Sequence, residues 1–502
     1  MNSSLNAARR RWELDEAGTD VVDVLVVGLG ATGAGAALDA ASRGLSVAAV
    51  DAHDLAFGSS RWSSKLIHGG LRYLASGQVG VAWESAVERD ALLRFTAPHL
   101  VAAHPYVLPL TPDVPRAQAA ALMTGYRLGD ALRAAAGTPR RLLPGPSRLS
   151  AGRALALAPS LRADGLRGAL LSWDGRVVDD ARLVVALART AAAHGARILT
   201  RCRALALAGD GARVRDELTG DEFDIRARTV INATGVWAGE LTPSVVLRPS
   251  RGTHLVLHPG ALGALRAGLH VPIPGERARF ALVLPQADGR VYAGLTDEPL
   301  DGPVPDVPEA PESDVAFLLE VIGTALDRPL SHADVAGAFA GLRPLVDAVD
   351  APEATGGRTA DLSRRHAVLR SPDGVVTVVG GKLTTYRRMA EDAVDAACPD
   401  ARASRTARLP LVGAGPVRPG APGRLARRYG SESWAVRDLM RADPALAEPV
   451  ALGITRAELV WAVRHEGALD AGDLLDRRTR IGLVPEDRAA ALPAAEAALA
   501  YA

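Results

Sequence analysis

The segment VVDVLVVGLGATG, residues 21–33, decides the fold of this chain. Its first seven residues are β-branched or aliphatic apart from Asp23, a composition typical of a strand buried on both faces. The G-x-G-x-x-G turn that follows consists of Gly28, Leu29, Gly30, Ala31, Thr32 and Gly33. The first glycine of such a turn makes the bend, the second lets a pyrophosphate approach, and the third lets a helix pack on the strand. Backbone N–H groups and the helix dipole then favour phosphate oxygens.

The residues after this turn complete a βαβ unit. An alanine-rich stretch predicts a helix over about residues 33–43, Gly44 is a suitable stop, and a second strand over residues 46–50 ends at Asp51. A carboxylate at this position can accept the ribose hydroxyls of a dinucleotide. The context favours a dinucleotide site, contacted by the turn and by Asp51, over a purely structural turn. It does not separate FAD from NAD.

The segment DLAFGSSRWSSKLIHGGLRYL, residues 54–74, favours FAD. Its small hydroxyl side chains can follow an extended cofactor along the pyrophosphate and then the ribityl chain, and they belong to Ser59, Ser60, Ser63 and Ser64. The glycines at 69–70 would let backbone approach a ring closely. A Ser/Gly-rich surface loop is the alternative, but it does not explain why the segment also carries Lys65, His68, Arg72 and Tyr73.

Lysine is nearly absent from the composition. Of 58 Lys and Arg residues, only Lys65 and Lys382 are lysines. An ammonium group is a compact charge on a flexible stem and a guanidinium is a wide planar fork, so a tight pocket can distinguish them. We interpret the two lysines as positions where arginine does not serve. Chance survival is the alternative.

Further motifs resemble those of the FAD-dependent glycerol-3-phosphate dehydrogenase family, within the larger class of flavoprotein amine and alcohol oxidases. They follow the family's order over about residues 21–482 and read DDARL (179–183), NATG (232–235), RGTH (251–254), GLRPL (341–345), SR (363–364), GGKLTTYR (380–387) and LLDRRTR (474–480). GGKLTTYR and KLIHGGLRYL are the most specific. The chain departs from the family at Asp51, where Glu is commoner, at Trp62, where a small residue is usual, and at Leu295, which replaces a threonine.

The resemblance implies roles for residues inside these motifs. Arg343 and Arg364 resemble the arginines that hold the substrate phosphate, and Arg72 with Tyr73 would face the substrate. A helix opening at Lys382 would stabilise negative charge on the flavin, and its ammonium group would serve substrate or flavin. Thr384 would add a hydrogen bond to substrate or cofactor, and His68 would orient the flavin. The remaining cofactor contacts would come from Lys65, Gly235, Gly381, Lys382 and Leu383.

Catalytic roles are expected for His254, Lys382 and Arg343. His254 is the candidate base, because a neutral imidazole near pH 7 can take a hydroxyl proton. A role in substrate binding or packing alone stays open for this histidine. For each arginine taken singly, a solvated surface position is the alternative.

The predicted architecture is α/β, and α+β overall, in three parts. A Rossmann-type FAD-binding domain comprises about residues 21–75, 175–245 and 340–398, an antiparallel-sheet substrate domain comprises about 76–174 and 246–339, and a helical C-terminal domain comprises 399–502. Residues 1–20 are expected to be a polar, solvated tail. Within the substrate domain the pattern predicts helices over 76–172, interrupted by proline-rich stretches, and antiparallel strands over 250–300.

Composition argues against several classes of function. A net charge of +1 provides no basic field for nucleic acid, and two cysteines are too few for a disulfide framework or a cysteine metal site, so no metal is expected. The sequence contains no uncharged apolar stretch long enough to predict a transmembrane helix. Its polar first twenty residues do not resemble a secretory signal, and a cytoplasmic location is expected.

The family resemblance implies oxidation of sn-glycerol 3-phosphate to dihydroxyacetone phosphate, with hydride passing to flavin N5 and electrons to a membrane quinone. That acceptor implies peripheral contact with the cytoplasmic membrane face. A glycerol-3-phosphate oxidase that uses O2, a related flavin amine or alcohol oxidase, and a non-catalytic flavoprotein remain alternatives. A homodimer also remains open.

Overall fold

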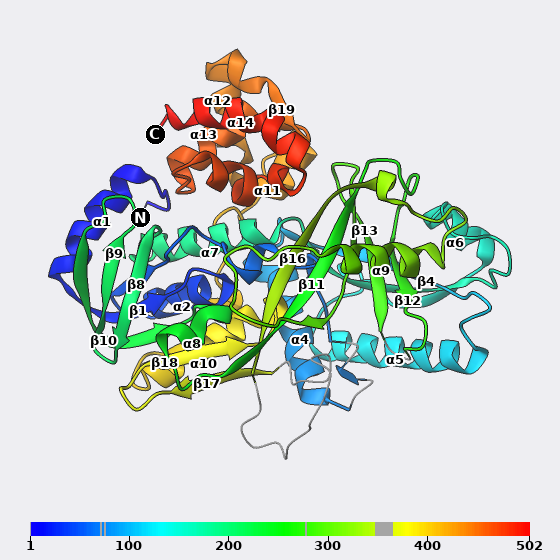
Figure 1. Ribbon diagram of the computed structural model, residues 1–502, viewed down its shortest axis with the longest axis horizontal. Helices are drawn as coiled ribbons and strands as arrows, with labels where there is room; N and C mark the ends of the chain where they lie inside the picture. Colours follow the sequence, from blue (N-terminus) through cyan, green and yellow to red (C-terminus); the bar gives the residue numbers. More distant parts are fainter. Residues whose placement is uncertain (1, 71–72, 75–76, 277–278, 347–364) are drawn as a thin grey trace.

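The computed structural model describes residues 2–70, 73–74, 77–276, 279–346 and 365–502. Two sheets lie side by side, and a helical C-terminal part lies along one side of this pair, at the top in Figure 1, with contacts to both. The predicted mixed α/β class, with an antiparallel second sheet and a helical C-terminal part, is confirmed.

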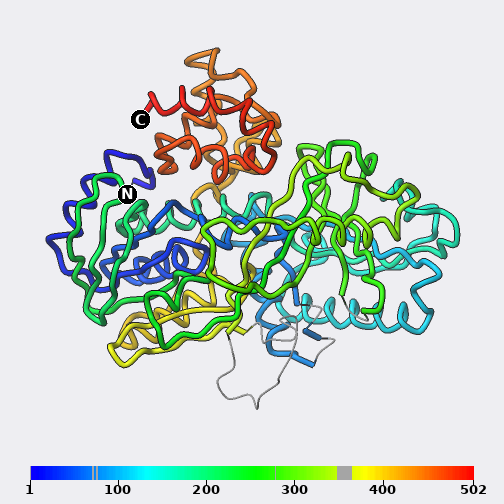
Figure 2. The backbone as a smooth tube through the Cα atoms, in the orientation of Figure 1, coloured from blue at the N-terminus to red at the C-terminus, as the bar shows by residue number. Residues whose placement is uncertain are grey.

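The first sheet is built around the segment at residues 21–33. Its parallel strands, in spatial order, are β18 (Val376–Gly380), β10 (Glu222–Asn232), β1 (Val21–Val27), β2 (Val47–Val50) and β7 (Arg197–Leu199). Antiparallel additions are β17 (His366–Arg370), β8 (Cys202–Ala208) and β9 (Gly211–Asp216). Segments far apart in sequence therefore meet in one sheet, as the blue, green and yellow parts of the tube show (Figure 2).

Helices cover both faces of this sheet. One face packs against α2 (Ala31–Ser42), α7 (Asp180–Ala193) and α10 (Tyr386–Ala397). Asp179 caps the second of these helices, because the Arg182 N–H donates to its side chain at 3.3 Å.

The other face packs against α1 (Ala7–Thr19) together with β8 and β9. The expectation of a solvated N-terminal tail is therefore wrong. Arg10 is buried and donates to the Asp216 carboxylate at 2.5 Å and to the Thr200 carbonyl at 2.7 Å. These buried bonds fix a helix whose composition reads as polar.

Ten strands of the described chain form the second sheet. They are β3 (Leu66–Ile67), β4 (Val101–Pro109), β5 (Ser147–Leu149), β6 (Ala169–Val177), β11 (Leu247–Leu257), β12 (Gly268–Pro272), β13 (Phe280–Pro285), β14 (Val291–Gly294), β15 (Glu298–Pro299) and β16 (Val335–Val346). Pairing is antiparallel except between β12 and β4. The associated helices are α4 (Val79–Ala91), α5 (Arg116–Ala135), α6 (Ala151–Leu157) and α9 (Glu312–Gly323).

The expectation of helices over residues 76–172, interrupted by proline-rich stretches, is wrong at β4, at β5 and at the start of β6. β4 lies inside the sheet between β6 and β12, so its last four residues are all buried and show no alternation. A buried run that lacks the alternation of apolar and polar residues is hard to recognise as a strand from the sequence. Pro105 argues further against a strand at this position.

The C-terminal part is mainly helical, as predicted. Its helices are α11 (Gly423–Tyr429), α12 (Ser433–Ala442), α13 (Arg456–His465) and α14 (Pro485–Leu499), with a short pair of strands, β19 (Pro449–Ala451) and β20 (Ile454–Thr455). Across the described residues, we find no helix whose length and apolar character would allow it to cross a bilayer.

Candidate cofactor and substrate site

A cavity of about 910 Å³ lies at the carboxyl ends of the parallel strands and extends to the second sheet. Val27, Asp51, Ala233 and Gly380 line it at the ends of β1, β2, β10 and β18. His254 on β11 and Arg343 on β16 line it from the second sheet. Ligands of open α/β sheets bind at this edge.

The glycine-rich turn shapes one end of the cavity. Gly28 has φ +97°, and a Cβ there would lie 2.6 Å from the Ala233 carbonyl oxygen. A Cβ on Gly33 would overlap the Gly28 carbonyl, so this glycine serves close helix packing and does not line the cavity. Gly30, Ala31 and Thr32 do line it.

The N-terminus of α2 faces the cavity without a side-chain cap. Its N-cap is Gly30, and the Ala31 N–H donates to Ser60 Oγ at 2.9 Å. The first N–H groups of a helix have no partner within it, and the helix dipole favours an anion there. This end therefore fits the pyrophosphate of a dinucleotide.

Asp51 is poised to receive further hydrogen bonds. Its carboxylate accepts from the N–H groups of Leu29 at 2.7 Å and His53 at 2.8 Å. Burial raises its pKa to about 6, because these bonds do not fully replace water. Ribose hydroxyls would add the missing donors.

The four serines join the two sheets and all line the cavity. Ser60 contacts α2, as above, and Ser59 donates from Oγ to the Leu342 carbonyl at 2.5 Å. Ser63 donates to Asp180 at 2.7 Å, and Ser64 Oγ lies 2.8 Å from His254 Nε2. An extended ligand beside the serine loop would pass from α2 to His254.

Lys65 does not reach the cavity, so the expected direct cofactor contact is wrong. Its ammonium group is fully buried and donates to Asp180 at 2.7 Å and to the Arg61 carbonyl at 2.8 Å. The same Asp180 oxygen accepts from Ser63. Pairing with a buried carboxylate holds the lysine behind the serine loop, where it supports Ser63.

His254 is buried where the serine loop meets the second sheet. Its ring stacks on Phe339 with centroids 4.8 Å apart. Burial, with the nearby charges of Lys65 and Arg343, lowers the pKa of His254 to about 3. The imidazole is therefore neutral at pH 7, as a base requires.

Arg343 has a fixed orientation on β16. Its guanidinium donates to Asp297 at 3.2 Å, to Ser250 Oγ at 3.2 Å and to the Thr296 carbonyl at 3.1 Å. A Cβ on Gly252 would overlap this guanidinium, so glycine leaves the room it occupies. Held by these three groups, the cation lines the cavity.

Lys382 and Tyr73 meet across the cavity wall. The Lys382 ammonium group lies 4.1 Å from the Tyr73 ring centroid and donates to Ser85 Oγ at 2.6 Å. Lys382 precedes a single 3₁₀ turn, Leu383–Thr385, which continues as α10. Thr384 Oγ1 accepts from the His68 N–H at 3.2 Å. His68 and Thr384 both line the cavity, as do Gly235, Gly381 and Leu383.

Arg89 and Asp174 are among the cavity residues that the sequence did not predict, and two predicted residues cannot be placed. Arg89 and Asp174 form an ion pair of 2.5 Å beside Gly69, whose N–H donates to Asp174 at 3.0 Å. Neither belongs to a motif that distinguishes it from the many other charged residues. Arg72 and Arg364 lie outside the described residues.

Two family models together match most of the chain. The model of the FAD dependent oxidoreductase family matches residues 23–387. A second, the C-terminal domain of alpha-glycerophosphate oxidase, matches residues 404–501.

Similar proteins carry consistent names. Glycerol-3-phosphate dehydrogenase 1 of Mycobacterium tuberculosis is 53% identical over 97% of this chain and 96% of its own length. The mitochondrial glycerol-3-phosphate dehydrogenase SDP6 of Arabidopsis thaliana is 34% identical over 94% of this chain and 81% of its own length. A glycerol-3-phosphate dehydrogenase from Bacillus halodurans, solved with FAD, is 25% identical, with a TM-score of 0.75 over 99% of this chain and 94% of that one.

Proposed function

Since the chain belongs to the FAD-dependent glycerol-3-phosphate dehydrogenase family, we propose that it oxidises sn-glycerol 3-phosphate to dihydroxyacetone phosphate. The proposal is supported by one cavity that combines the N-terminus of α2 with the side chains of His254, Arg343 and Lys382. The first feature suits the cofactor, and the three side chains suit a phosphorylated alcohol. FAD, when bound, supplies the hydride acceptor at N5.

The glycine-rich turn and the start of α2 would hold the cofactor pyrophosphate, and Asp51 would accept the ribose hydroxyls. Ser59, Ser60, Ser63 and Ser64 would follow the chain between pyrophosphate and ring, with His68, Gly235, Gly381, Leu383 and Thr384 nearby. The residues present therefore fit FAD.

Arg343 would bind the substrate phosphate and Lys382 would add a second positive charge to the same pocket. Arg72 and Arg364 would complete this group. Tyr73 would define one wall, because the Lys382 ammonium group lies on its ring face. With the phosphate fixed, the carbinol carbon would be held in one orientation.

His254 would take the proton of the substrate hydroxyl. Its low pKa leaves the imidazole neutral at physiological pH, and the bond to Ser64 fixes its ring. The same low pKa makes His254 a weak base, so it would take the hydroxyl proton as hydride leaves the carbinol carbon, when that proton becomes strongly acidic. We further propose a membrane quinone as electron acceptor and peripheral contact with the cytoplasmic membrane face, on the family resemblance.

Anaerobic mixing of the holoenzyme with glycerol 3-phosphate tests the reaction. We expect the flavin absorbance at about 450 nm to bleach, because oxidised flavin absorbs there. Glycine and proline serve as controls for the amine-oxidase alternative and should leave it unchanged. An absorbance that stays constant with glycerol 3-phosphate would contradict the proposal and favour a non-catalytic flavoprotein.

Reoxidation of the reduced enzyme tests the acceptor. A soluble quinone analogue should restore the absorbance faster than air-saturated buffer does, with little hydrogen peroxide formed. Rapid reoxidation by oxygen with one peroxide per turnover would instead identify an oxidase.

A further inference from the structure

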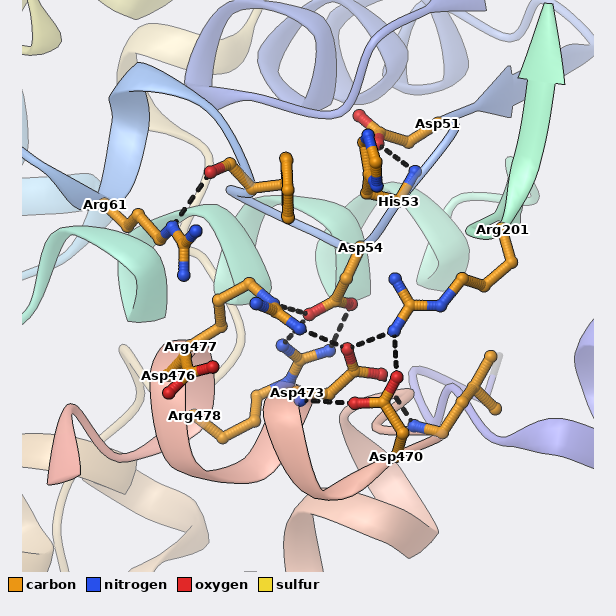
Figure 3. Close-up of polar contacts among 12 residues, drawn as sticks. Asp51, His53, Asp54, Arg61, Arg201, Asp470, Asp473, Asp476, Arg477 and Arg478 are labelled. Atoms are coloured by element: carbon orange, nitrogen blue, oxygen red, sulfur yellow. Dashed lines mark hydrogen bonds and ion pairs between the residues drawn. The ribbon is translucent and has the colours of Figure 1, made fainter. Parts of the chain in front are cut away.

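The loop that follows β2 has two sides with different neighbours. One side lines the cavity through Asp51, His53, Phe57, Ser59 and Ser60. The other side is covered by the C-terminal part of the chain, at the segment Asp473–Arg480 (Figure 3). Among the described residues, those that line the cavity end at Met389, so the C-terminal part contributes no wall of its own.

Asp54 is the point of attachment. This carboxylate is fully buried and accepts from Arg477 Nε at 2.6 Å and from Arg478 Nη1 and Nη2 at 2.7 and 2.9 Å. Burial opposes its ionisation, but the two guanidinium groups hold the pKa of Asp54 below its usual range. The attachment is therefore charged throughout the physiological pH range.

A second link fastens the start of the same loop. The Arg201 N–H donates to the His53 carbonyl at 2.7 Å, and the Arg201 guanidinium pairs with Asp473 at 2.7 Å and with Asp470. Asp473 also pairs with Arg477 at 2.5 Å. The links at His53 and Asp54 thus belong to one network of alternating charges, in which losing one member leaves a buried charge unbalanced.

Side-chain packing connects the ion pair of Asp54 and Arg477 to the wall of the cavity. The Arg477 guanidinium lies 5.7 Å from the Phe57 ring centroid, and Phe57 stacks on His53 at 3.8 Å. Ala56 N–H donates to the Leu29 carbonyl at 3.0 Å, which ties the loop to the glycine-rich turn. A shift of Asp54 would therefore move both Asp51 and the Ser59–Ser60 pair.

We propose that Arg477 and Arg478 are positioning residues for the cofactor: through Asp54, the C-terminal part holds the loop in the conformation that binds FAD. The idea rests on the proposed contacts of Asp51, Ser59 and Ser60 with FAD. According to this proposal, the LLDRRTR segment lies outside the cavity but controls the affinity for the cofactor.

The test compares Arg477→Gln with Arg424→Gln. Arg424 pairs with Glu458 inside the C-terminal part, and neither residue contacts the loop, so this variant removes an ion pair of a more exposed arginine from the same part as a control. FAD affinity is measured by titrating the apoprotein with FAD, and global unfolding is followed by circular dichroism. We expect Arg477→Gln to raise the FAD dissociation constant by about tenfold or more, because small misplacements of binding groups have effects of this order. Arg424→Gln should change it less than about twofold.

Holoenzyme measurements keep the test decisive if the apoprotein is difficult to prepare. In Arg477→Gln, flavin fluorescence should report FAD release well below the temperature of global unfolding, whereas in Arg424→Gln the two transitions should coincide. Arg477→Lys, which keeps the charge, should restore part of the affinity. Equal effects of Arg477→Gln and Arg424→Gln on FAD release and on unfolding would overturn the proposal.

A double substitution tests whether Arg477 acts through Asp54. If it does, Arg477→Gln should add little to the FAD dissociation constant of Asp54→Asn. Fully additive effects would contradict this route. The readout is separate from catalysis: a holoenzyme with normal FAD affinity that is not reduced by glycerol 3-phosphate would count against the proposed function only.

Discussion

Arg343 is held on β16 by Asp297, Ser250 and the Thr296 carbonyl, and this fixed cation should dominate phosphate recognition. We expect Arg343→Ala to lower kcat/KM for glycerol 3-phosphate by about 10- to 100-fold, since a hydrogen bond to a charged group contributes about 1.5–3 kcal/mol. Turnover of glycerol, which lacks the phosphate, should change little. Arg228→Ala, at an exposed position on β10, is the control. If kcat/KM for glycerol 3-phosphate were unchanged, the phosphate would be held elsewhere.

Substitution of His254 tests whether this residue is a catalytic base or only binds the substrate. As a base, His254→Asn should slow flavin reduction by about 100-fold or more with FAD content unchanged. Because the native pKa is about 3, the histidine itself should add no inflection to the rate of flavin reduction between pH 5 and 8. Stopped-flow reduction across this pH range measures both. A higher KM with an unchanged reduction rate would assign it to binding alone.

The sequence located most candidate residues because they lie in strings rich in glycine and hydroxyl side chains. It misjudged Lys65, since rarity marks a residue as constrained without saying whether the constraint is a ligand or a buried partner such as Asp180. Arg89 and Asp174 could not be found, because only the folded chain brings α4 beside β6.

At the level of elements, β1, α2 and β2 are predictable because their signals are local: apolar runs, glycine punctuation and a terminal aspartate. α1 is not, because its stabilising contacts come from Thr200 and Asp216, about 190 and 206 residues away. The strand β4 is not predictable for a similar reason, since its partners β6 and β12 are distant in sequence.

The start of α2 carries a prediction about glycine. Gly33→Ala should abolish or severely reduce FAD content, because the added methyl group overlaps the Gly28 carbonyl and must displace the helix from β1. Gly80→Ala, on α4 with open space around it, is the matched control and should stabilise the fold by about 0.5 kcal/mol. FAD content is measured from the ratio of absorbance at about 450 nm to protein absorbance. A normal FAD content in Gly33→Ala would show that the turn tolerates repacking.

For the whole molecule, burial of histidines sets the response to acid. Burial lowers the pKa of His99 and His270 to about 4 and that of His104 and His254 to about 3. In the unfolded chain they would titrate near about 6.5, so acid protonates the unfolded state first and favours unfolding. Between about pH 7.5 and 5.5 each histidine should cost about 1.4 kcal/mol of stability.

Carboxyl groups with a raised pKa act in the opposite direction, and they belong to Glu13, Asp39, Asp51, Glu88, Asp174 and Asp473. Burial also lowers the pKa of His53, His194 and His465, which adds to the histidine effect. The pKa values of Asp51 and Asp473 are raised to about 6, so the folded state takes up their protons before the unfolded state does. Asp51 and Asp473 offset less than half of the stability lost through the four histidines with a pKa of about 3 or 4. They are only two groups, and they begin to take up protons at a lower pH than an unfolded histidine does. Urea unfolding of the holoenzyme should therefore show a lower free energy of unfolding at pH 5.5 than at pH 7.5. His104→Gln, outside the cavity, should reduce this difference by the share of one histidine, and an unchanged difference would mean that His104 titrates normally in the folded state.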